Sequence, residues 1–261
     1  MKYIVLSFDD GRKDFYQYAL PILKKYNLNA TLNVITDFIG KSDLCAFASG
    51  GGICMSLSEI VECSKYGIEI ANHSANHTNS IEKILKGQEK LKELLGKSSR
   101  IGFASPSSVI CSENFSNYSH LQKNNIIEYF RSGNQLRRDG YFHLFLWLLY
   151  KMTKFTRFFC WYNNRNYIDL KKEKINGFFP SVTCNAETEK YSIIRFIKEM
   201  PENSAAILMF HSILPKDSPY FGKDKWYNST DDFASICAFL ASYNDIKVVT
   251  NMQLKDLITS E

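Results

Sequence analysis

The chain alternates short apolar runs with longer stretches in which apolar residues recur at helical spacing. Six runs have the length and the composition of buried strands. They cover residues 3–7, 30–35, 67–71, 101–104, 205–210 and 246–250. Weaker strand patterns lie at 125–130 and 178–183. Amphipathic helices are predicted between the strands, at 81–95, 187–200 and 231–243.

A further helix is predicted over residues 15–26, where Phe15, Ala19 and Ile22 share one helical face and Pro21 is expected to introduce a kink. Strands and helices that alternate with short connections are typical of a parallel sheet with right-handed crossovers. We therefore predict an α/β fold, a distorted (β/α) barrel of seven or eight parallel strands, in a single domain that spans residues 1–261.

The composition narrows the class of protein. The 261 residues are 45% apolar and 23% charged, which excludes a disordered chain, a collagen-like repeat and a polytopic membrane protein. Seven cysteines without a Cys-x-x-Cys pair indicate neither a disulfide framework nor a cysteine zinc site. The first residues lack a basic-then-apolar signal followed by a cleavage site, so the sequence predicts a cytoplasmic protein.

Two adjacent carboxylates stand at the end of the first predicted strand, in Ser7-Phe8-Asp9-Asp10-Gly11. Side chains alternate along a strand, so one carboxylate would reach a metal directly and its neighbour would reach the same site from the following turn. The alternative is an Asp-Gly turn or a helix cap, because a predicted helix follows.

Histidines follow two other predicted strands. His73 and His77 are four residues apart, a spacing that a helical turn or a tight loop can bring to one metal ion. His211 ends the apolar run 205–210. Taken singly, each histidine has a structural alternative as a polar loop or capping residue. All three clusters nevertheless follow strands, at the edge where a parallel barrel has its active site.

In this order the clusters resemble the motifs of the polysaccharide deacetylase family, also called the NodB-homology family or carbohydrate esterase family 4. Asp9-Asp10 is similar to the family's Thr-Phe-Asp-Asp-Gly motif, and His73 with His77 to its His-Ser/Thr-x-x-His motif. His211 is similar to the histidine that ends an apolar strand in the last motif. The resemblance covers residues 3–110 and 190–258.

The resemblance implies a role for each of these residues. Asp10, His73 and His77 would hold one divalent metal ion, zinc first, with cobalt, nickel, iron or manganese as alternatives. Asp9 would be the general base that takes a proton from the attacking water. His211 would be the general acid that protonates the leaving amine, and a backbone N–H of the third motif would stabilise the oxyanion.

That third motif departs from the family. One branch reads Phe-Ala-Tyr-Pro-Tyr-Gly, whereas residues 103–108 read Phe-Ala-Ser-Pro-Ser-Ser. We predict that Ser105, Pro106 and Ser107 shape the substrate pocket and that the N–H of Ser107 is the oxyanion donor. The arginine that usually orients the catalytic aspartate is missing, and Arg131 is the predicted substitute at the pocket. Trp226 is predicted to line the sugar site, with a packed loop position as the alternative.

Residues 120–180 resemble the family poorly and are predicted to be an insert. Between residues 121 and 176 there are 11 basic and four acidic residues, although the net charge of the whole chain is only +5. Within the insert, residues 141–161 combine an apolar run, too short to span a bilayer, with alternating basic and aromatic residues. A helix packed on the barrel, a lid, a dimer face and contact with an anionic membrane surface all fit this pattern.

The favoured hypothesis is a cytoplasmic, metal-dependent hydrolase that removes an N-acetyl group from an amino sugar. Through residues 141–161 the protein would also be able to associate peripherally with the inner membrane surface. Its substrate would be a nucleotide-linked, lipid-linked or oligosaccharide intermediate of surface-glycan assembly, and the basic insert favours an anionic one. Deformylation, hydrolysis of a non-sugar amide and a catalytically inactive glycan-binding barrel are the alternatives. No nucleic acid is expected as a partner, because no recognised module is present. The sequence leaves the oligomeric state open.

Overall fold

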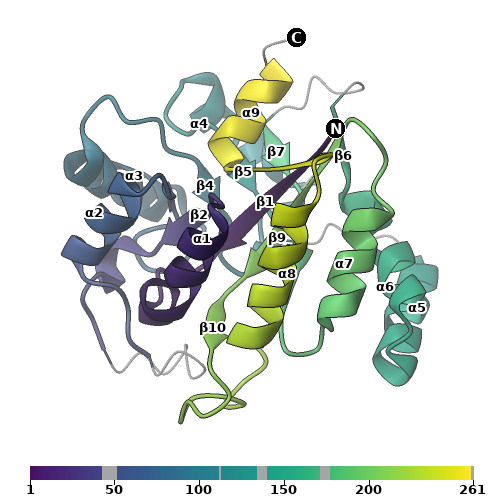
Figure 1. Cartoon of the computed structure of the whole chain (residues 1–261). Coiled ribbons are helices and arrows are strands. Elements are labelled where there is room, and N and C mark those ends of the chain that lie inside the picture. Colours follow the sequence, from purple (N-terminus) through teal and green to yellow (C-terminus); the bar gives the residue numbers. More distant parts are fainter. Residues whose placement is uncertain (43–51, 112, 134–139, 171–176, 260–261) are drawn as a thin grey trace.

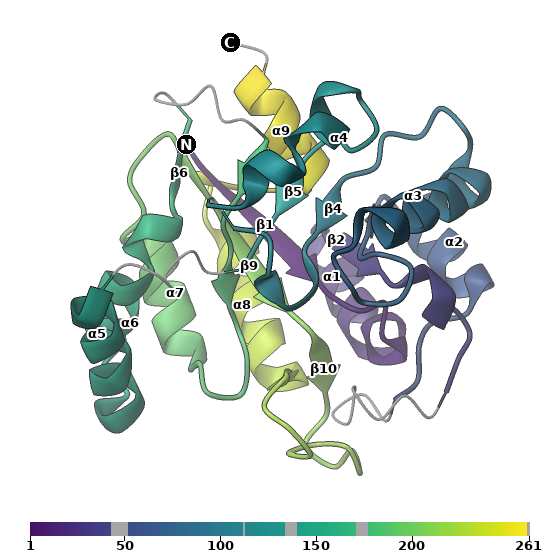
Figure 2. The same ribbon diagram turned by 180° about the vertical axis from the view of Figure 1, so that it is seen from behind.

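A mostly parallel, nearly closed sheet forms the centre of the molecule, and helices surround it (Figures 1 and 2). This computed structural model describes residues 1–42, 52–111, 113–133, 140–170 and 177–259. Strand β1 (Lys2–Phe8) lies at the middle of the sheet and pairs along its whole length with β9 (Ser204–Phe210). On its other side, β1 pairs first with β12 (Ile246–Val249) and then with β2 (Thr31–Val34).

The sheet continues in parallel from β2 and nearly closes on itself. The strands that follow in spatial order are β3 (Glu69–Asn72), β4 (Phe103–Ala104), β5 (Phe130–Arg131) and β7 (Phe178–Phe179). Directly after β7 in the chain, β8 (Val182–Thr183) pairs with β9 and brings the sheet back beside β1. This return confirms the predicted distorted (β/α) barrel.

Two smaller pairings complete the strand arrangement. β6 (Ile168–Asp169) adds an antiparallel pair to the first residues of β9. β10 (Ser212–Leu214) and β11 (Tyr227–Ser229) form a separate parallel pair just beyond the end of β9. His211 is the single residue between β9 and β10, and each of these strands is hydrogen-bonded to its own partner, β1 and β11.

The helices lie outside the sheet. They are α1 (Leu20–Tyr26), α2 (Leu57–Lys65), α3 (Ile81–Leu95), α4 (Ser119–Lys123), α5 (Gly140–Thr153), α6 (Thr156–Asn163), α7 (Lys190–Lys198), α8 (Thr230–Ser242) and α9 (Asn251–Thr259). The helix expected at 81–95 is confirmed with those bounds. The helix expected over 15–26 is divided into a π-helical turn, Phe15–Ala19, and α1. Pro21 lies in the first turn of α1, where its missing N–H leaves no interior helical hydrogen bond unmade.

The core lies between the sheet and these helices. Phe8 of β1 is fully buried and contacts the rings of Phe15, Phe210 and Phe233, with centroids 4.8 to 5.5 Å away. The cysteines that the structure describes are free thiols, and all except Cys111 are buried. Among the described helices, none has both the length and the apolar character needed to cross a membrane.

The predicted insert forms two helices at the edge of the molecule. α5 packs on α6, and α6 packs on α7, so the pair lies at the side opposite α2 and α3 (Figures 1 and 2). Seven of the charged residues counted in the insert lie outside the described residues; they are Arg137, Arg138, Asp139, Lys171, Lys172, Glu173 and Lys174. The charge of the insert can therefore be placed only for α5, α6 and their immediate neighbours.

Candidate functional site

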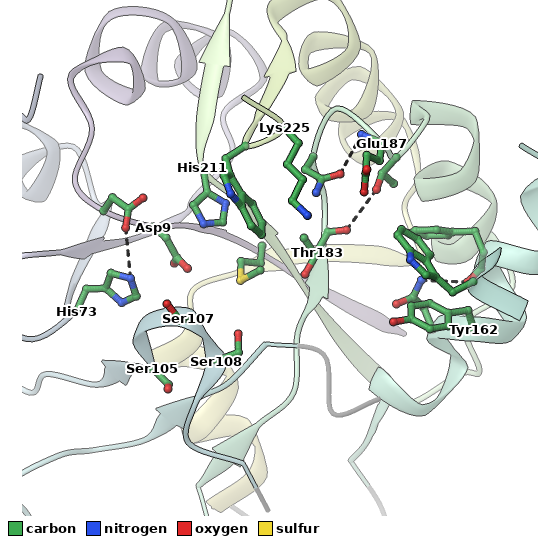
Figure 3. Close-up of a pocket in the computed structure, with 18 of the residues that line it drawn as sticks. Asp9, His73, Ser105, Ser107, Ser108, Tyr162, Thr183, Glu187, His211 and Lys225 are labelled. Atoms are coloured by element: carbon green, nitrogen blue, oxygen red, sulfur yellow. Dashed lines mark hydrogen bonds and ion pairs between the residues drawn. The ribbon is translucent and has the colours of Figure 1, made fainter. Parts of the chain in front are cut away.

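A cavity of about 460 Å³ lies at the carboxyl ends of the parallel strands (Figure 3). β1 ends before Asp9, β3 before His73, β4 before Ser105 and β9 before His211. All four of these residues line the cavity, and so do Asp10 and His77. The expectation that the three separate clusters meet at one edge therefore agrees with the geometry, because parallel strands present their carboxyl ends together.

Asp9 is almost fully buried, and its orientation is fixed by residues of two other strands, β2 and β5. The Nη2 of Arg131 on β5 donates to Oδ1 at 2.5 Å, and the Nδ2 of Asn33 on β2 donates to the same oxygen at 2.8 Å. Burial by itself would raise the pKa of this carboxyl, but the charge of Arg131 and its hydrogen bond to Oδ1 lower the pKa below its ordinary value, and His73 and His211 add to this effect when they are protonated. Among the described residues both hydrogen bonds end on Oδ1, which leaves Oδ2 as the oxygen that can accept a proton.

Asp10 reaches the cavity from a strained turn. Its φ is +77°, in the left-handed region that non-glycine residues rarely adopt. This turn brings two adjacent carboxylates to one site, although side chains on a regular strand alternate. Arg12 holds Asp10 by donating from Nε and Nη2 to Oδ2, at 2.9 and 2.7 Å. Burial would raise the pKa of Asp10, but the charge of Arg12 and the contact with His73 keep it well below its usual value.

The remaining oxygen of Asp10 faces two imidazole rings. Oδ1 is buried without a hydrogen-bond partner and lies 3.4 Å from Nε2 of His73 and 3.5 Å from Nε2 of His77. The Nδ1 of His73 lies 2.8 Å from the carbonyl oxygen of Ala104. A carbonyl only accepts, so Nδ1 carries the proton and Nε2 presents its lone pair to Asp10.

These three side chains form a donor set for a divalent cation. The ligand atoms of Asp10, His73 and His77 all lie within 4.8 Å of one another. Burial and the neighbouring His73 lower the pKa of His77, which favours the neutral ring that a metal requires. An unpartnered carboxylate oxygen beside two imidazole nitrogens is unfavourable unless a cation lies between them. The residues present therefore fit one metal ion with a carboxylate and two imidazole ligands.

His211 lies on the other side of the cavity, between β9 and β10. Its ring packs against the indole of Trp226, with centroids 4.7 Å apart. Burial lowers the pKa of His211 to about 4, against the raising effects of Asp10 and Asp9. The ring is therefore neutral at pH 7 in the free protein. Trp226 lines the cavity as expected from the sequence.

The loop of the third motif borders the same cavity. Ser105 is buried, and its hydroxyl donates to Oδ1 of Asn79 and accepts from the N–H of Ile110, both at 2.9 Å. Pro106 is buried, and its carbonyl oxygen accepts a 2.9 Å hydrogen bond from Asn79. Ser107 and Ser108 line the cavity and have φ of +51° and +54°. Ser105 and Pro106 thus hold the loop, whereas Ser107 is exposed at the cavity.

Arg131 is placed differently from a pocket residue. It is fully buried, and its guanidinium contacts Asp9 rather than the open cavity. Arg131 therefore orients the carboxylate from β5, which is the position of the substitute arginine expected from the sequence. Arg131 is not among the residues that line this cavity, and its predicted part in substrate binding stays a prediction.

The far wall of the cavity comes from the insert and from loops that the sequence did not single out. α5 contributes Trp147, and α6 contributes Phe159, Tyr162 and Asn163. The rings of Trp147 and Tyr162 stack with centroids 5.2 Å apart and an interplanar angle of 29°. Lys225, Glu187 and Thr183 lie between this wall and His211 (Figure 3).

Two supporting residues were also missed. Asn33 interrupts the apolar run of β2, and a buried amide inside a strand was a signal that it bonds something specific. Arg12 follows the Asp-Asp-Gly turn, and only the structure shows that it turns back onto Asp10 and also donates to Oγ of Ser212 at 3.0 Å. That serine in turn donates to the buried Asp14 at 2.9 Å.

Comparison with known proteins agrees with the resemblance. Residues 1–117 match the family model described as "Polysaccharide deacetylase". The curated protein "Putative polysaccharide deacetylase YxkH" of Bacillus subtilis (strain 168) is 33% identical over 76 residues, which are 29% of this chain and 24% of that protein. The matched stretch thus spans about a quarter of the relative's length.

Solved structures share the fold over nearly the whole chain. A family 4 acetyl xylan esterase from Clostridium thermocellum, in complex with a cobalt ion, is 17% identical, with a TM-score of 0.52 over 99% of this chain and 91% of that one. A protein from Mycobacterium smegmatis, titled "putative polysaccharide deacetylase", is 13% identical, with a TM-score of 0.56 over 99% of this chain and 90% of that one. At such identities the likeness shows the fold.

Proposed function

We propose that this chain, whose residues 1–117 match the polysaccharide deacetylase family, is a member of that family and a metal-dependent hydrolase that removes the N-acetyl group of an amino sugar. The observation that carries the proposal is the unpartnered Oδ1 of Asp10 between two imidazole nitrogens, with Asp9 and His211 on the same cavity. A structural ion pair would need neither the second carboxylate nor the opposing histidine.

Asp10, His73 and His77 would hold the ion. A divalent metal bound there supplies Lewis acidity, which lowers the pKa of a water and polarises an amide carbonyl. One carboxylate and two imidazoles suit zinc, and cobalt, nickel, iron or manganese also accept such a donor set. The Clostridium thermocellum esterase, which shares this fold, is in complex with a cobalt ion, and this supports the proposal of a transition metal.

Asp9 is the proposed general base. Arg131 and Asn33 hold its Oδ1, so the carboxylate presents Oδ2 toward the cavity and accepts the proton of the attacking water there. The lowered pKa of Asp9 keeps it ionised at neutral pH, which a base needs before the reaction begins. The same lowered pKa makes Asp9 a weak base in the resting site. Asp9 accepts the proton more readily as charge develops on the attacking water and the amide during the reaction.

His211 is the proposed general acid. Because its pKa in the metal-free protein is about 4, the ring must first take up a proton, and the proton that Asp9 removes from the water is available for this. Negative charge that develops on the reacting amide raises the pKa of the ring, so that it can hold this proton and pass it to the leaving amine. Trp226 packs on the ring and limits its rotation. The N–H of Ser107, on the exposed loop across the cavity, is the proposed hydrogen-bond donor to the oxyanion.

The substrate is proposed to be a nucleotide-linked, lipid-linked or oligosaccharide intermediate that carries an N-acetylated amino sugar. The stacked Trp147 and Tyr162 and the exposed Lys225 extend the cavity well beyond the metal ligands, which supports a substrate larger than a single sugar. Lys225 supports an anionic group near the reacting sugar. The free cysteines among the described residues support a reducing, cytoplasmic compartment.

The test is acetate release by the purified chain, loaded with zinc or cobalt, from a panel of soluble N-acetylhexosamine compounds that includes nucleotide-linked and oligomeric ones. We expect turnover by the native protein and none by the D9N variant, with metal binding retained in both. D245N is the matched control, because it makes the same substitution at an exposed aspartate that does not line the cavity.

The outcomes separate the proposal from its alternatives. Release of formate from an N-formyl analogue, without acetate release, would assign deformylation to the same site. Neither product from any sugar or non-sugar amide, with the metal bound, would support an inactive glycan-binding barrel. Full turnover by D9N would remove Asp9 from the role of base.

A further inference from the structure

Helix α5 is apolar on two opposite faces. His143, Leu146 and Tyr150, spaced three and four residues apart, are buried against the rest of the protein. On the other side, Tyr141, Phe145, Leu148 and Met152 follow the same helical spacing, with exposed fractions of 92%, 53%, 48% and 81%. A helix that is apolar all round is normally buried on all sides.

The outward face continues beyond α5. We call it the outer aromatic face; its members are Tyr141, Phe142, Leu144, Phe145, Leu148, Met152, Phe155 and Trp161. Each of these side chains is at least 46% exposed. Elsewhere among the described residues, at most two exposed large apolar side chains share a helix, namely Ile81 and Leu85 on α3. Eight exposed apolar side chains within residues 141–161, a segment whose two helices pack together, mark a contact surface.

The charged residues within α5, α6 and the turn between them are all basic, although the neighbouring Glu187 neutralises one of them. Residues 140–163 include Lys151, Lys154 and Arg157 and no aspartate or glutamate. Lys151 pairs with Glu187 at 3.0 Å and lies over the ring of Trp147, and Arg157 lies over the ring of Trp161. Arg157 and Lys151 are both exposed, so cationic groups border the apolar side chains.

The exposed apolar face and its basic margin together favour one kind of partner over another. A second copy of the chain, packed face to face, would bring the basic residues of one copy against those of the other. An apolar face with aromatic side chains and a basic margin matches instead the acyl boundary and the anionic headgroups of a phospholipid surface. The aromatic rings match the interfacial layer, where Trp and Tyr are enriched.

We propose that the outer aromatic face docks on the surface of an anionic phospholipid bilayer. α5 would lie in the plane of the interface, with Phe145, Leu148 and Met152 among the acyl chains and Lys151 and Arg157 at the headgroups. The same helix contributes Trp147 to the wall of the cavity, so docking would hold the cavity next to the membrane surface. The location of α5 and α6 at the edge of the molecule leaves this face open to a planar surface (Figures 1 and 2).

The experiment is flotation of the full chain with large vesicles of phosphatidylcholine alone or with 30% phosphatidylglycerol (about the anionic content at which basic residues add measurable binding). We expect the chain to float more strongly with the anionic vesicles than with phosphatidylcholine alone, and high salt to reduce this preference. The variant F145S/L148S/M152S should lose binding by about a hundredfold or more, since each large apolar side chain taken out of the interface costs about tenfold.

Two controls keep the result interpretable. L57S/I81S/L85S removes three exposed apolar side chains from α2 and α3, where exposed fractions are 52%, 38% and 37%, and should float as the native chain does. Circular dichroism and thermal unfolding of both triple variants show that they are folded. K151Q/R157Q should still bind by its apolar face but lose most of its preference for anionic vesicles.

The outcomes are decisive without any activity measurement, so failure here is distinguishable from failure of the proposed hydrolase. The proposal is overturned if the native chain does not float, or if F145S/L148S/M152S floats as strongly as the native chain. It is also overturned if light scattering shows a native dimer that this variant converts to a monomer, because the outer aromatic face would then be a subunit interface.

Discussion

The contact between Arg131 and Asp9 gives the sharpest test of how this site is built. The side chains of both residues are buried, with exposed fractions of 0% and 5%, and the guanidinium donates to Oδ1 of Asp9. Replacing Arg131 by Met leaves a chain of similar length without the charge. Asp9 would then be a buried carboxylate that keeps only the hydrogen bond from Asn33.

The magnitude follows from that loss. Removing one partner of a buried ion pair costs about 3–5 kcal/mol, because the remaining charge has no compensation. R131M should therefore lower the free energy of unfolding by about that amount at pH 7. R100M is the matched control, since Arg100 is 45% exposed and pairs with Glu128 and Asp256 at the surface, where such pairs contribute less than about 1 kcal/mol.

The pH dependence of this loss has a definite sign. In the native chain Arg131 keeps the pKa of Asp9 below its ordinary value of 3.8, so this stabilisation is present above pH 3.8 and is lost as the pH falls through the lower folded pKa. Without Arg131, burial would raise the pKa of Asp9 above 3.8. The carboxyl of the variant would then take up a proton as the pH falls toward 4, and the stability difference from the native chain should shrink.

Urea unfolding at pH 7 and pH 4.5, followed by far-ultraviolet circular dichroism, measures both effects. If the enzyme proposal holds, the acidic limb of the pH–activity profile of R131M should also move to higher pH. A loss at pH 7 no larger than that of R100M, together with an unmoved acidic limb, would refute the role of Arg131 in holding Asp9 ionised.

Four further predictions concern single residues of the site. D10N should weaken binding of zinc by at least about a hundredfold in calorimetric titration, because changes that only touch a ligand's neighbours already cost 10- to 100-fold; equal affinity would exclude Asp10 as a ligand. G87A should destabilise the fold by about 1–3 kcal/mol and weaken zinc binding, since a Cβ at Gly87 would lie 2.5 Å from Oδ1 of Asn72 and 3.0 Å from the backbone of Ser74, beside His73; unchanged melting would contradict this packing. In the metal-free protein, the folded chain resists protonation of His211, whose pKa is about 4, whereas the unfolded chain takes up a proton near pH 6.5. The free energy of unfolding should therefore fall by about 2–3 kcal/mol as the pH falls from 6.5 toward 4, and H211Q should show a flatter decline over that range. Parallel curves of unfolding free energy against pH for H211Q and the native chain would refute the lowered pKa. W147A should raise KM for an oligomeric or nucleotide-linked substrate by about tenfold with a smaller change in kcat, because Trp147 lines the cavity far from the metal ligands; an unchanged KM would show that substrate does not reach α5.

The residues that could be predicted from the sequence are those whose chemistry is local. Asp9 and Asp10, His73 and His77, and His211 each follow an apolar run, and a parallel barrel brings such positions together without further information. The strained turn that aims Asp10 into the cavity could be inferred only in outline, because alternation along a strand excludes a regular geometry for two adjacent ligands. The exact strand bounds at β5, β7 and β8 depended on pairing across the closing sheet, which no local pattern encodes.

The supporting contacts could not be predicted in the same way, because they join residues far apart in the chain. Arg131 is 122 positions from Asp9, and its place beside the carboxylate depends on β5 lying next to β4 in the sheet. For Asn33, an amide within an apolar strand was a weak indication of a specific hydrogen bond. For Arg12, the sequence indicated no contact with Asp10 beyond its position after the turn. The role of such a side chain depends on which residues the closed sheet places beside it, and a single stretch of sequence does not contain that information.

The cavity therefore unites parts of the chain with different origins in the sequence. The matched residues 1–117 supply the proposed metal ligands, the proposed base and the serine loop, and the strand before His211 completes the polar half. The opposite wall comes from α5 and α6, which lie outside the family match and present a second apolar face to solvent. If both proposals hold, a change in α5 would alter what enters the cavity and where the molecule is held, because one side of the helix faces the cavity and the other faces solvent. On this proposal the family-like residues supply the chemistry, and the insert determines the substrate and the location.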